Sequence, residues 1–397
     1  MNATIEATPG SGWAAPVESS VHRLLKDQPI RRLVVKVGSN VLTAGTERLD
    51  LEIMAGLVGQ VARLRQRSLD VVVVSSGAIA AGRHRLGLAK LPRDVPLKQV
   101  FAAVGQSRLM QAWDQLFSWH GIIIAQTLLT RDDLADRQRY LNARNTLLAL
   151  LELGVIPIVN ENDVVAVDEI RESRIGDNDN LSAMVAGLVD ADLLVMLSDT
   201  PGLFTADPRR DPSATLIPVV SHIDASIEAL AGGAGSSRGT GGMITKLQAA
   251  RVATSAGTAV VIAPGRERDV LVRLVDGEPL GTLFVPAATK LESRKRWMLS
   301  DLTHRGRIVV DDGAARALRE QGRSLLPAGV VAVEGRFERG DIVSIDDIQG
   351  NRIGCGISNY SSTEIAIIKG CRSNRIAELL GYDYGSEVVH RNNLVTV

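Results

Sequence analysis

The sequence has few of the residues that mark several common classes of protein. The 397 residues include two cysteines, Cys355 and Cys371, too few for a disulfide framework and typical of reduced thiols in a cytosolic protein. The six histidines form no His-x-His pair and no HExxH motif, so no zinc site is predicted. With a formal net charge of +0, no overall charge favours nucleic acid or an anionic membrane. No apolar run reaches the length that spans a membrane.

The residues that are present indicate two domains. A chain of 397 residues exceeds the size of one ordinary domain, and an apolar fraction of 45% can fill substantial cores. Residues 1–28 lack a basic start followed by an apolar stretch, so we expect a flexible tail rather than a signal peptide. We expect a first domain over residues 29–291 and a second, smaller domain over residues 304–397, joined through the basic segment 293–297.

Short apolar runs alternate with segments of helical periodicity in the first domain. Strands are predicted at residues 31–38, 70–77, 122–129, 155–160, 192–199 and 258–263. Helices are predicted at residues 51–67, 97–119, 137–153, 181–188 and 243–256. This alternation predicts an α/β fold with a mostly parallel sheet covered by helices on both faces. Beyond residue 304 the pattern predicts short strands at 307–310, 329–333 and 341–345 and a helix at 314–321, hence a small β-rich domain.

Polar side chains lie where several predicted strands end. Lys36 stands near the end of an apolar strand, where a buried lysine needs an anionic partner. The run SSGA at 75–78 joins hydroxyl groups to a glycine that permits a tight turn, and NEND at 160–163 follows the fourth strand. The run GDNDN at 176–180 immediately precedes a predicted helix; capping explains one such residue but not four. Because ligands bind beyond the carboxyl ends of parallel strands, we expect a site here.

A glycine-rich run over residues 231–242 leads into the helix predicted from Met243. Alone it suits an ordinary solvent loop, but glycines also let the backbone approach a ligand, and a helix N-terminus attracts phosphate. Lys246, one turn into the helix, adds a positive charge. The chain has no GxxxxGK[ST] motif, and no GxGxxG follows the first strand. Two lysines with acidic residues suit phosphoryl transfer, which depends on positioning and charge neutralisation.

Several motifs together resemble the amino acid kinase family and, within it, the branch that phosphorylates the side-chain carboxylate of glutamate. The motifs are VKVG (35–38), SSGAIAAG (75–82), AVGQSR (103–108), NEND (160–163), GDNDNLS (176–182) and GTGGMITKLQA (239–249). The C-terminal part resembles a PUA domain through SLLP (324–327), RGD (339–341) and GYDY (381–384). The resemblance covers nearly everything after residue 31 and implies an amino acid kinase fold followed by a PUA-like domain.

The resemblance implies ATP-dependent formation of L-glutamyl 5-phosphate from L-glutamate, the first step of proline biosynthesis. In the implied catalytic group, Asp179 holds Lys36 and Lys246, which neutralise the transferring phosphoryl group. The implied glutamate-binding residues are Ser76, Asp163 and Asn178. The implied ATP-binding residues are Lys36, Ser198, Asp199, Thr240, Gly241, Gly242, Met243, Ile244, Thr245 and Lys246. Mg²⁺ is expected to accompany ATP, and no protein residue is named as its ligand.

The resemblance also implies partners and leaves alternatives. It implies feedback inhibition by proline, a homo-oligomer and contact with glutamyl-phosphate reductase. The two cysteines and the absence of a long apolar run favour a cytoplasmic location without membrane contact. The alternatives are a kinase of the same family acting on acetylglutamate, aspartate, carbamate or a nucleotide, a regulatory amino-acid sensor, and an RNA-binding protein. The SSGA run and the PUA-like domain argue against the other kinases. Residues 304–397 hold twelve Lys/Arg and twelve Asp/Glu, without the basic excess of RNA-binding surfaces, so nucleic acid is not an expected partner.

Overall fold

The computed structural model describes residues 29–88, 95–166, 177–231, 241–287, 289–290 and 306–396. The expected tail over residues 1–28, the basic segment 293–297, Thr240 and most of the glycine-rich run lie outside these residues. The chain forms two compact units, the first from Met1–Thr130 with Leu147–Ala287 and the second from Arg131–Thr146 with Ala288–Val397. In the described residues, no helix is both long enough and apolar enough to cross a membrane.

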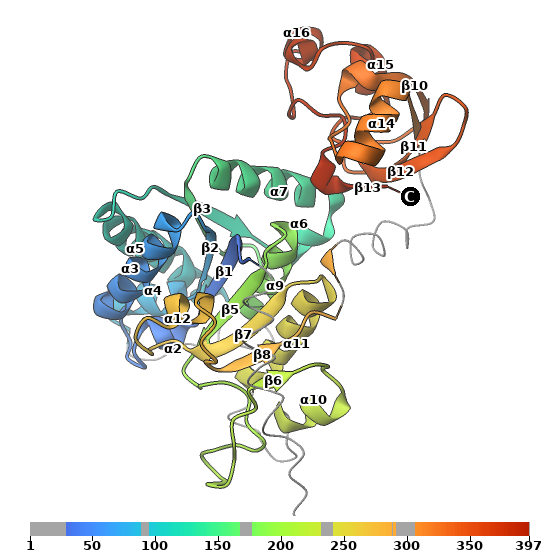
Figure 1. Ribbon diagram of the computed structural model, residues 1–397. Helices are drawn as coiled ribbons and strands as arrows, with labels where there is room; N and C mark the ends of the chain where they lie inside the picture. Colours follow the sequence, from blue (N-terminus) through green and yellow to red (C-terminus); the bar gives the residue numbers. More distant parts are fainter. Residues whose placement is uncertain are drawn as a thin grey trace, which may run out of the picture. The chain divides into compact units, whose positions relative to one another are not determined.

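The first unit is built on an eight-stranded sheet in the order β3-β4-β2-β1-β5-β7-β8-β6 (Figure 1). The strands are β1 Arg32–Val37, β2 Asp70–Ser75, β3 Ile124–Leu129, β4 Ile156–Glu161, β5 Leu193–Ser198, β6 Val219–Val220, β7 Ala259–Pro264 and β8 Thr282–Phe284. All neighbouring strands pair in parallel except β7 with β8. The mostly parallel sheet is therefore confirmed, with all six predicted strands in place, whereas β6 and β8 were not predicted.

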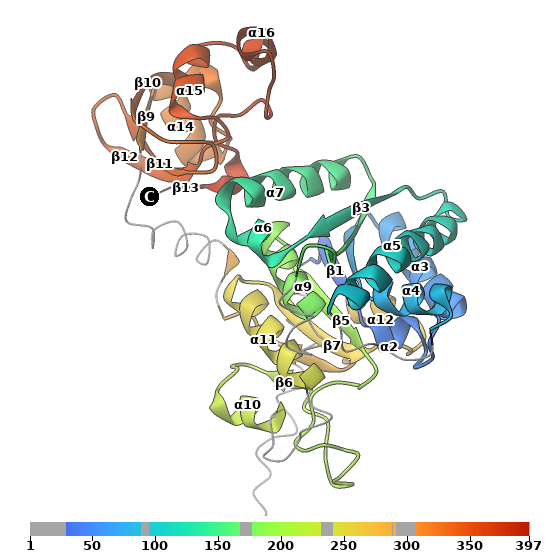
Figure 2. The ribbon, with the colours of Figure 1, turned by 180° about the vertical axis from the view of Figure 1, so that it is seen from behind.

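Helices cover both faces of this sheet. The helices wholly within the first unit are α2 Ser39–Leu42, α3 Leu51–Gln66, α4 Ala78–Leu86, α5 Val95–Ser118, α9 Asp177–Leu188, α10 Ala225–Ala231, α11 Gly241–Ser255 and α12 Val270–Val275. Helix α3 begins where the Asp50 side chain accepts hydrogen bonds from the N–H groups of Glu52 and Ile53. Helices α9 and α11 lie side by side on the other face from α3 (Figure 2). Figures 1 and 2 together show the sheet between these layers.

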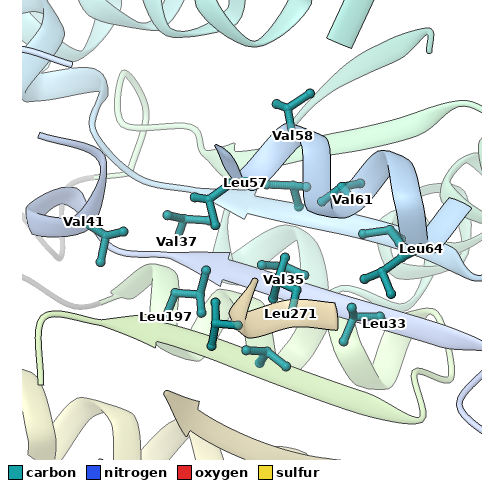
Figure 3. Packing of buried hydrophobic residues seen from close by; sticks show 14 of the residues in the cluster. Leu33, Val35, Val37, Val41, Leu57, Val58, Val61, Leu64, Leu197 and Leu271 are labelled. Atoms are coloured by element: carbon teal, nitrogen blue, oxygen red, sulfur yellow. The ribbon is translucent and has the colours of Figure 1, made fainter. Parts of the chain in front are cut away.

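The central strand β1 divides its side chains between the two faces. Leu33, Val35 and Val37 pack into the core with Leu57 of α3 and Leu271 of α12 (Figure 3). Because successive side chains in a strand point to opposite faces, the alternate residues of β1 point toward the layer of α9 and α11. Lys36 is one of these, which directs a cation away from the apolar core.

One local prediction was wrong. The residues from Asp177 to Asn180 form the first turn of α9, whereas the sequence indicated a loop before a helix that starts at Leu181. Four polar residues are compatible with a helix start, because side chains there accept hydrogen bonds from unpaired backbone N–H groups and acidic groups are favoured near the helix N-terminus. The consequence is that Asn178 and Asp179 are held on a rigid element.

The second unit contains a five-stranded sheet in the order β10-β9-β11-β12-β13. Its strands are β9 Gly306–Val310, β10 Val330–Gly335, β11 Ile342–Asp347, β12 Arg352–Ile357 and β13 Leu394–Thr396, and its helices include α14 Asp312–Gln321, α15 Ser362–Ile368 and α16 Ile376–Leu380. Pairing is antiparallel except between β9 and β11. The small β-rich domain is therefore confirmed.

Residues 131–146 also belong to the second unit, which the sequence did not indicate. They hold α6 Arg131–Ala135 and most of α7 Arg137–Glu152. Leu141 is fully buried in a cluster with Ile342, Ile357 and Val395. Cys355 lies in the same cluster, whereas Cys371 is half-buried, and both are free thiols.

Candidate active site

Polar side chains of the first unit gather at the carboxyl ends of its parallel strands. Lys36 is the penultimate residue of β1, Ser76 follows β2, Asn160 lies near the end of β4, and Ser198 ends β5. Strand β1 lies between β2 and β5. The strands that follow β1 in sequence are added first on the β2 side of the sheet and then, from β5 on, on the opposite side. Such a switch in strand order opens a crevice where ligands bind in α/β sheets.

Lys36, Asp179 and Lys246 form a buried charge cluster. The Lys36 Nζ lies 2.6 Å from Asp179 Oδ1, and the Lys246 Nζ lies 3.1 Å from Asp179 Oδ2. The exposed fractions of the three side chains are 6%, 1% and 12% respectively. The three residues come from β1, α9 and α11, so their meeting depends on the packing of α9 between the other two elements.

Further hydrogen bonds fix the geometry of the charge cluster. The Thr245 hydroxyl donates to Asp179 Oδ2 at 2.9 Å, and the Lys246 ammonium also donates to the Gly242 carbonyl at 3.2 Å. Asp179 thus contacts three donors, and Lys246 is held by both the carboxylate and its own helix. Thr245 was expected to bind ATP; in the structure its hydroxyl is directed at Asp179.

The electrostatics of the charge cluster favour an anionic ligand. Burial by itself raises the pKa of Asp179, but attraction to Lys36 and Lys246 outweighs this effect and leaves the pKa below its usual value. Burial lowers the pKa of Lys246; Asp179 opposes this change and repulsion from Lys36 adds to it. Two ammonium groups and one carboxylate carry a formal charge of +1. This positive charge lies beside the N-terminus of α11, where helix N–H groups attract phosphate.

A second polar group lies where β5 ends. The Ser198 hydroxyl donates to Asp199 at 3.2 Å, and the Asn40 amide donates to the same carboxylate at 2.9 Å. Burial raises the pKa of Asp199, while these hydrogen bonds and attraction to Lys246 lower it further than burial raises it. Asn40 was not selected from the sequence, although its position just after β1 obeys the same strand-end rule.

The three expected glutamate-binding residues lie on neighbouring elements. Ser76 is buried after β2, and its N–H donates to the Val37 carbonyl at 3.2 Å. Asp163 is half-buried two residues after β4, and burial raises its pKa to about 6. The side-chain Oδ1 of Asn178 is buried and has no hydrogen-bond partner in the described part of the chain. In that part, no hydrogen bond joins these three side chains to the charge cluster.

The expected ATP-binding residues lie largely at the start of α11. The helix begins at Gly241, with Met243 half-buried and Ile244 38% exposed. Thr240 lies outside the described residues, so the structure gives no account of it. Among the described residues, no group of three or more His, Cys, Asp and Glu side chains is arranged to hold a metal ion.

Comparisons with known proteins place this arrangement in a family. The family model described as "Amino acid kinase family" matches residues 31–264, more than half of the chain. The chain belongs to the amino acid kinase family. The PUA domain model matches residues 306–380. This amino acid kinase therefore carries a PUA domain whose matched residues include β9 to β12 of the second sheet.

Curated relatives of this amino acid kinase match nearly its whole length. The chain is 56% identical over 367 residues to the glutamate 5-kinase of Dehalococcoides mccartyi strain CBDB1, covering 92% of this chain and 98% of the relative. It is 57% identical over 364 residues to the glutamate 5-kinase of Herpetosiphon aurantiacus, with the same coverage. It is 50% identical over 368 residues to that of Pelobacter propionicus, covering 93% of this chain and 98% of the relative.

Proposed function

We propose that this amino acid kinase transfers the γ-phosphoryl group of ATP to the side-chain carboxylate of L-glutamate, forming L-glutamyl 5-phosphate for proline biosynthesis. The observation that carries the proposal is the buried charge cluster of Lys36, Asp179 and Lys246, in which two ammonium groups are held by one carboxylate. The relatives named glutamate 5-kinase, at 50–57% identity over nearly the whole chain, support glutamate as the acceptor. Acetylglutamate and aspartate are not favoured as acceptors, and RNA is not favoured as a binding partner.

The reaction requires little covalent help from the protein. A side-chain carboxylate has a pKa of about 4.3, so the acceptor is already ionised at pH 7 and needs no general base. The transferring phosphoryl group spreads negative charge over its oxygens in the transition state. Lys36 and Lys246 neutralise this charge, and Asp179 fixes both ammonium groups before the reaction begins. Preorganised charge of this kind needs no rearrangement at the moment of transfer.

ATP and Mg²⁺ belong to the proposal as the phosphoryl donor and its counter-ion. The first turn of α11 and the +1 charge cluster fit the phosphates of ATP, and Ser198 and Asp199 form the second polar group expected to contact the nucleotide. Mg²⁺ keeps several water ligands and is usually bound through phosphate oxygens with one or two carboxylates. We name no protein ligand for it.

Ser76, Asp163 and Asn178 are proposed to bind glutamate. The raised pKa of Asp163 reflects a carboxylate that lacks water, and a bound ammonium group would restore a favourable partner. The unpartnered Oδ1 of Asn178 offers a second acceptor to the same ammonium group. Asp163 is therefore assigned to the α-amino group, whereas the charge cluster is assigned to the phosphoryl group.

The remaining expectations stay predictions. They are feedback inhibition by proline, homo-oligomer formation, handover of the product to glutamyl-phosphate reductase, a cytoplasmic location, and domain limits at 29–291 and 304–397. The handover rests on chemistry, because an acyl phosphate near its own amine cyclises quickly at effective molarities of about 10⁵ M or more. A trap for free acyl phosphate that intercepts all product in a coupled assay would argue against handover.

The proposed function is tested by substrate-dependent release of ADP. The purified full-length chain is mixed with ATP and Mg²⁺, and ADP is measured with L-glutamate, L-aspartate or N-acetyl-L-glutamate as the acceptor. We expect Mg²⁺-dependent release with glutamate and much less with the other two. A preference for aspartate or acetylglutamate would overturn the proposal.

A further inference from the structure

Helix α5 is held very close to α4, the helix that begins two residues after Ser76. Glycines permit the contact: a Cβ atom on Gly105 would lie 1.7 Å from the Ala78 carbonyl oxygen, and one on Gly82 would lie 1.9 Å from the Phe101 carbonyl oxygen. These distances leave no room for a side chain, so the backbones of α4 and α5 touch at this crossing. Gln106 directly follows Gly105, and its Cα is therefore fixed beside the first turn of α4.

The side chain of Gln106 reaches the end of β4. The Asn160 amide nitrogen Nδ2 donates to Gln106 Oε1 at 2.8 Å. The Asn160 oxygen Oδ1 accepts from the backbone N–H of Glu161 at 2.9 Å. Since a backbone N–H can only donate, Asn160 has one possible orientation, with its NH₂ group toward Gln106. Gln106 must then present its oxygen to Asn160, and its own NH₂ group points elsewhere.

That NH₂ group has no partner among the residues that the structure describes. The Nε2 atom of Gln106 is buried and makes no hydrogen bond to any described residue. Buried donors are satisfied in the great majority of cases, so an orphan beside a ligand site calls for an explanation. Its neighbours define where the donor lies: Gln106 accepts from Asn160, three residues before Asp163, and follows Gly105, whose backbone meets the first turn of α4 just after Ser76.

We propose that Gln106 is a substrate-binding residue whose NH₂ group donates to the α-carboxylate of glutamate, with Asn160 as the positioning residue that orients the amide. The inference rests on the proposed function, because glutamate is the acceptor assumed. An α-amino acid carries one carboxylate acceptor and one ammonium donor. The site offers the complementary set: an orphan donor on Gln106, an orphan acceptor on Asn178, and the carboxylate of Asp163.

The variant Gln106→Glu tests this role directly. It keeps the size of the side chain and an oxygen that accepts from Asn160, but it replaces the NH₂ group by a negative oxygen. We expect the glutamate KM to rise by about 10–100-fold, the range for losing a hydrogen bond to a charged group, with a much smaller change in the ATP KM. The matched control is Gln111→Glu, which adds the same charge at an exposed position of the same helix.

A substrate analogue distinguishes the loss of a direct contact with the substrate from general damage to the fold. L-isoglutamine, the α-amide of glutamate, keeps the side-chain carboxylate but presents an NH₂ group in place of one α-carboxylate oxygen. The Q106E variant should therefore lose far less activity with isoglutamine than with glutamate, so the ratio of kcat/KM for glutamate to that for isoglutamine falls at least about tenfold. Damage to the fold alone would lower both values alike and leave the ratio unchanged.

The outcomes distinguish this inference from the proposed function. If the unaltered protein releases no ADP with glutamate, the proposed function fails. If the unaltered protein is active and Q106E keeps both its glutamate KM and its substrate ratio, only the role of Gln106 is overturned.

A second variant covers the case in which Q106E does not fold. Asn160→Asp introduces a carboxylate that still accepts from the Glu161 N–H but has no NH₂ group to donate to Gln106. The new carboxylate turns the Gln106 NH₂ group toward itself and away from the substrate. This variant should show the same fall in the substrate ratio, and an unchanged ratio would overturn the inference.

Discussion

The two ends of the candidate site differ in how their polar groups are satisfied. In the charge cluster of Lys36, Asp179 and Lys246, each charged side chain has an opposite charge within 3.1 Å, although all three are largely buried. Each charge of the cluster is thus paired within the protein itself. Because Asp179 holds both lysines at once, their positions do not depend on a ligand.

The proposed glutamate end, formed by Ser76, Gln106, Asp163 and Asn178, shows the opposite condition. Gln106 Nε2 and Asn178 Oδ1 are buried without hydrogen-bond partners in the described residues, and burial raises the pKa of Asp163. The difference shows that the groups held rigidly by the protein and the groups left for a substrate to bind lie at different ends of the candidate site. In the proposed mechanism, phosphoryl transfer uses groups arranged in advance, whereas substrate recognition uses groups whose hydrogen bonds the substrate itself completes.

Removing Asp179 should break the charge cluster and have the largest effect. The variant Asp179→Asn leaves two buried ammonium groups without a carboxylate, and loss of one partner from a buried pair costs about 3–5 kcal/mol of unfolding free energy. Chemical denaturation at pH 7 measures the loss. The control is Asp276→Asn, whose partner Arg67 lies 2.7 Å away in an exposed pair worth about 0–1 kcal/mol. Equal denaturation midpoints for the two variants would contradict this account of the cluster.

Removing Lys246 should affect turnover more than binding. Loss of one preorganised contact to transition-state charge lowers kcat by about 10²–10³-fold, so Lys246→Ala should lose this much with a smaller change in glutamate KM. Initial-rate kinetics with glutamate varied measure both quantities. Lys369→Ala, an exposed lysine of the second unit, is the control and should be unchanged. A variant with normal kcat and reduced stability would assign Lys246 a structural role only.

Pushing α5 away from α4 should disturb the glutamate end while leaving the charge cluster intact. Gly105→Ala places a Cβ atom 1.7 Å from a backbone oxygen, and overpacking of this kind typically costs about 1–3 kcal/mol. Glutamate KM should rise because Gln106 shifts with its helix. The control is Gly59→Ala in α3, where an added Cβ meets nothing within 4 Å and gains about 0.5–1 kcal/mol of helix propensity. If both variants gained stability, the close crossing would be disproved.

Lowering the pH should weaken the glutamate end alone. Burial raises the pKa of Asp163 to about 6, so its carboxylate is ionised above this pH and protonated below it. An ammonium group is attracted only to the ionised form, and kcat/KM for glutamate should therefore fall about tenfold per pH unit below about pH 6. The ATP KM over the same range serves as the internal control. Asp163→Asn should raise the glutamate KM and abolish the fall of kcat/KM below about pH 6. If the fall persisted in this variant, the pKa near 6 would belong to another group.

Much of the site could be predicted from local patterns. The strand-end rule selected Lys36 and the runs SSGA at 75–78 and NEND at 160–163, because each lies where a run of apolar β-branched residues ends. Ser76, Asp163 and Ser198 were named individually only through the family resemblance. The same rule applied to Asn40 would have selected it too, since it follows β1 closely. Gln106 carries no such signal, because it lies within a long helix and its proposed role depends on Gly105 beside it and on Asn160.

The sequence by itself determined the six longer strands of the first unit, the mostly parallel sheet and the β-rich character of the C-terminal part, since hydrophobic periodicity and strand length are local properties of the chain. Only the tertiary structure decided which groups meet. Asp179 pairs with Lys36 and Lys246 because α9 packs between β1 and α11, and the direction of the Gln106 amide depends on a hydrogen-bond relay through Asn160. Leu141 joins the second unit for the same reason: its partners lie far along the chain, and no local pattern encodes a contact between distant residues.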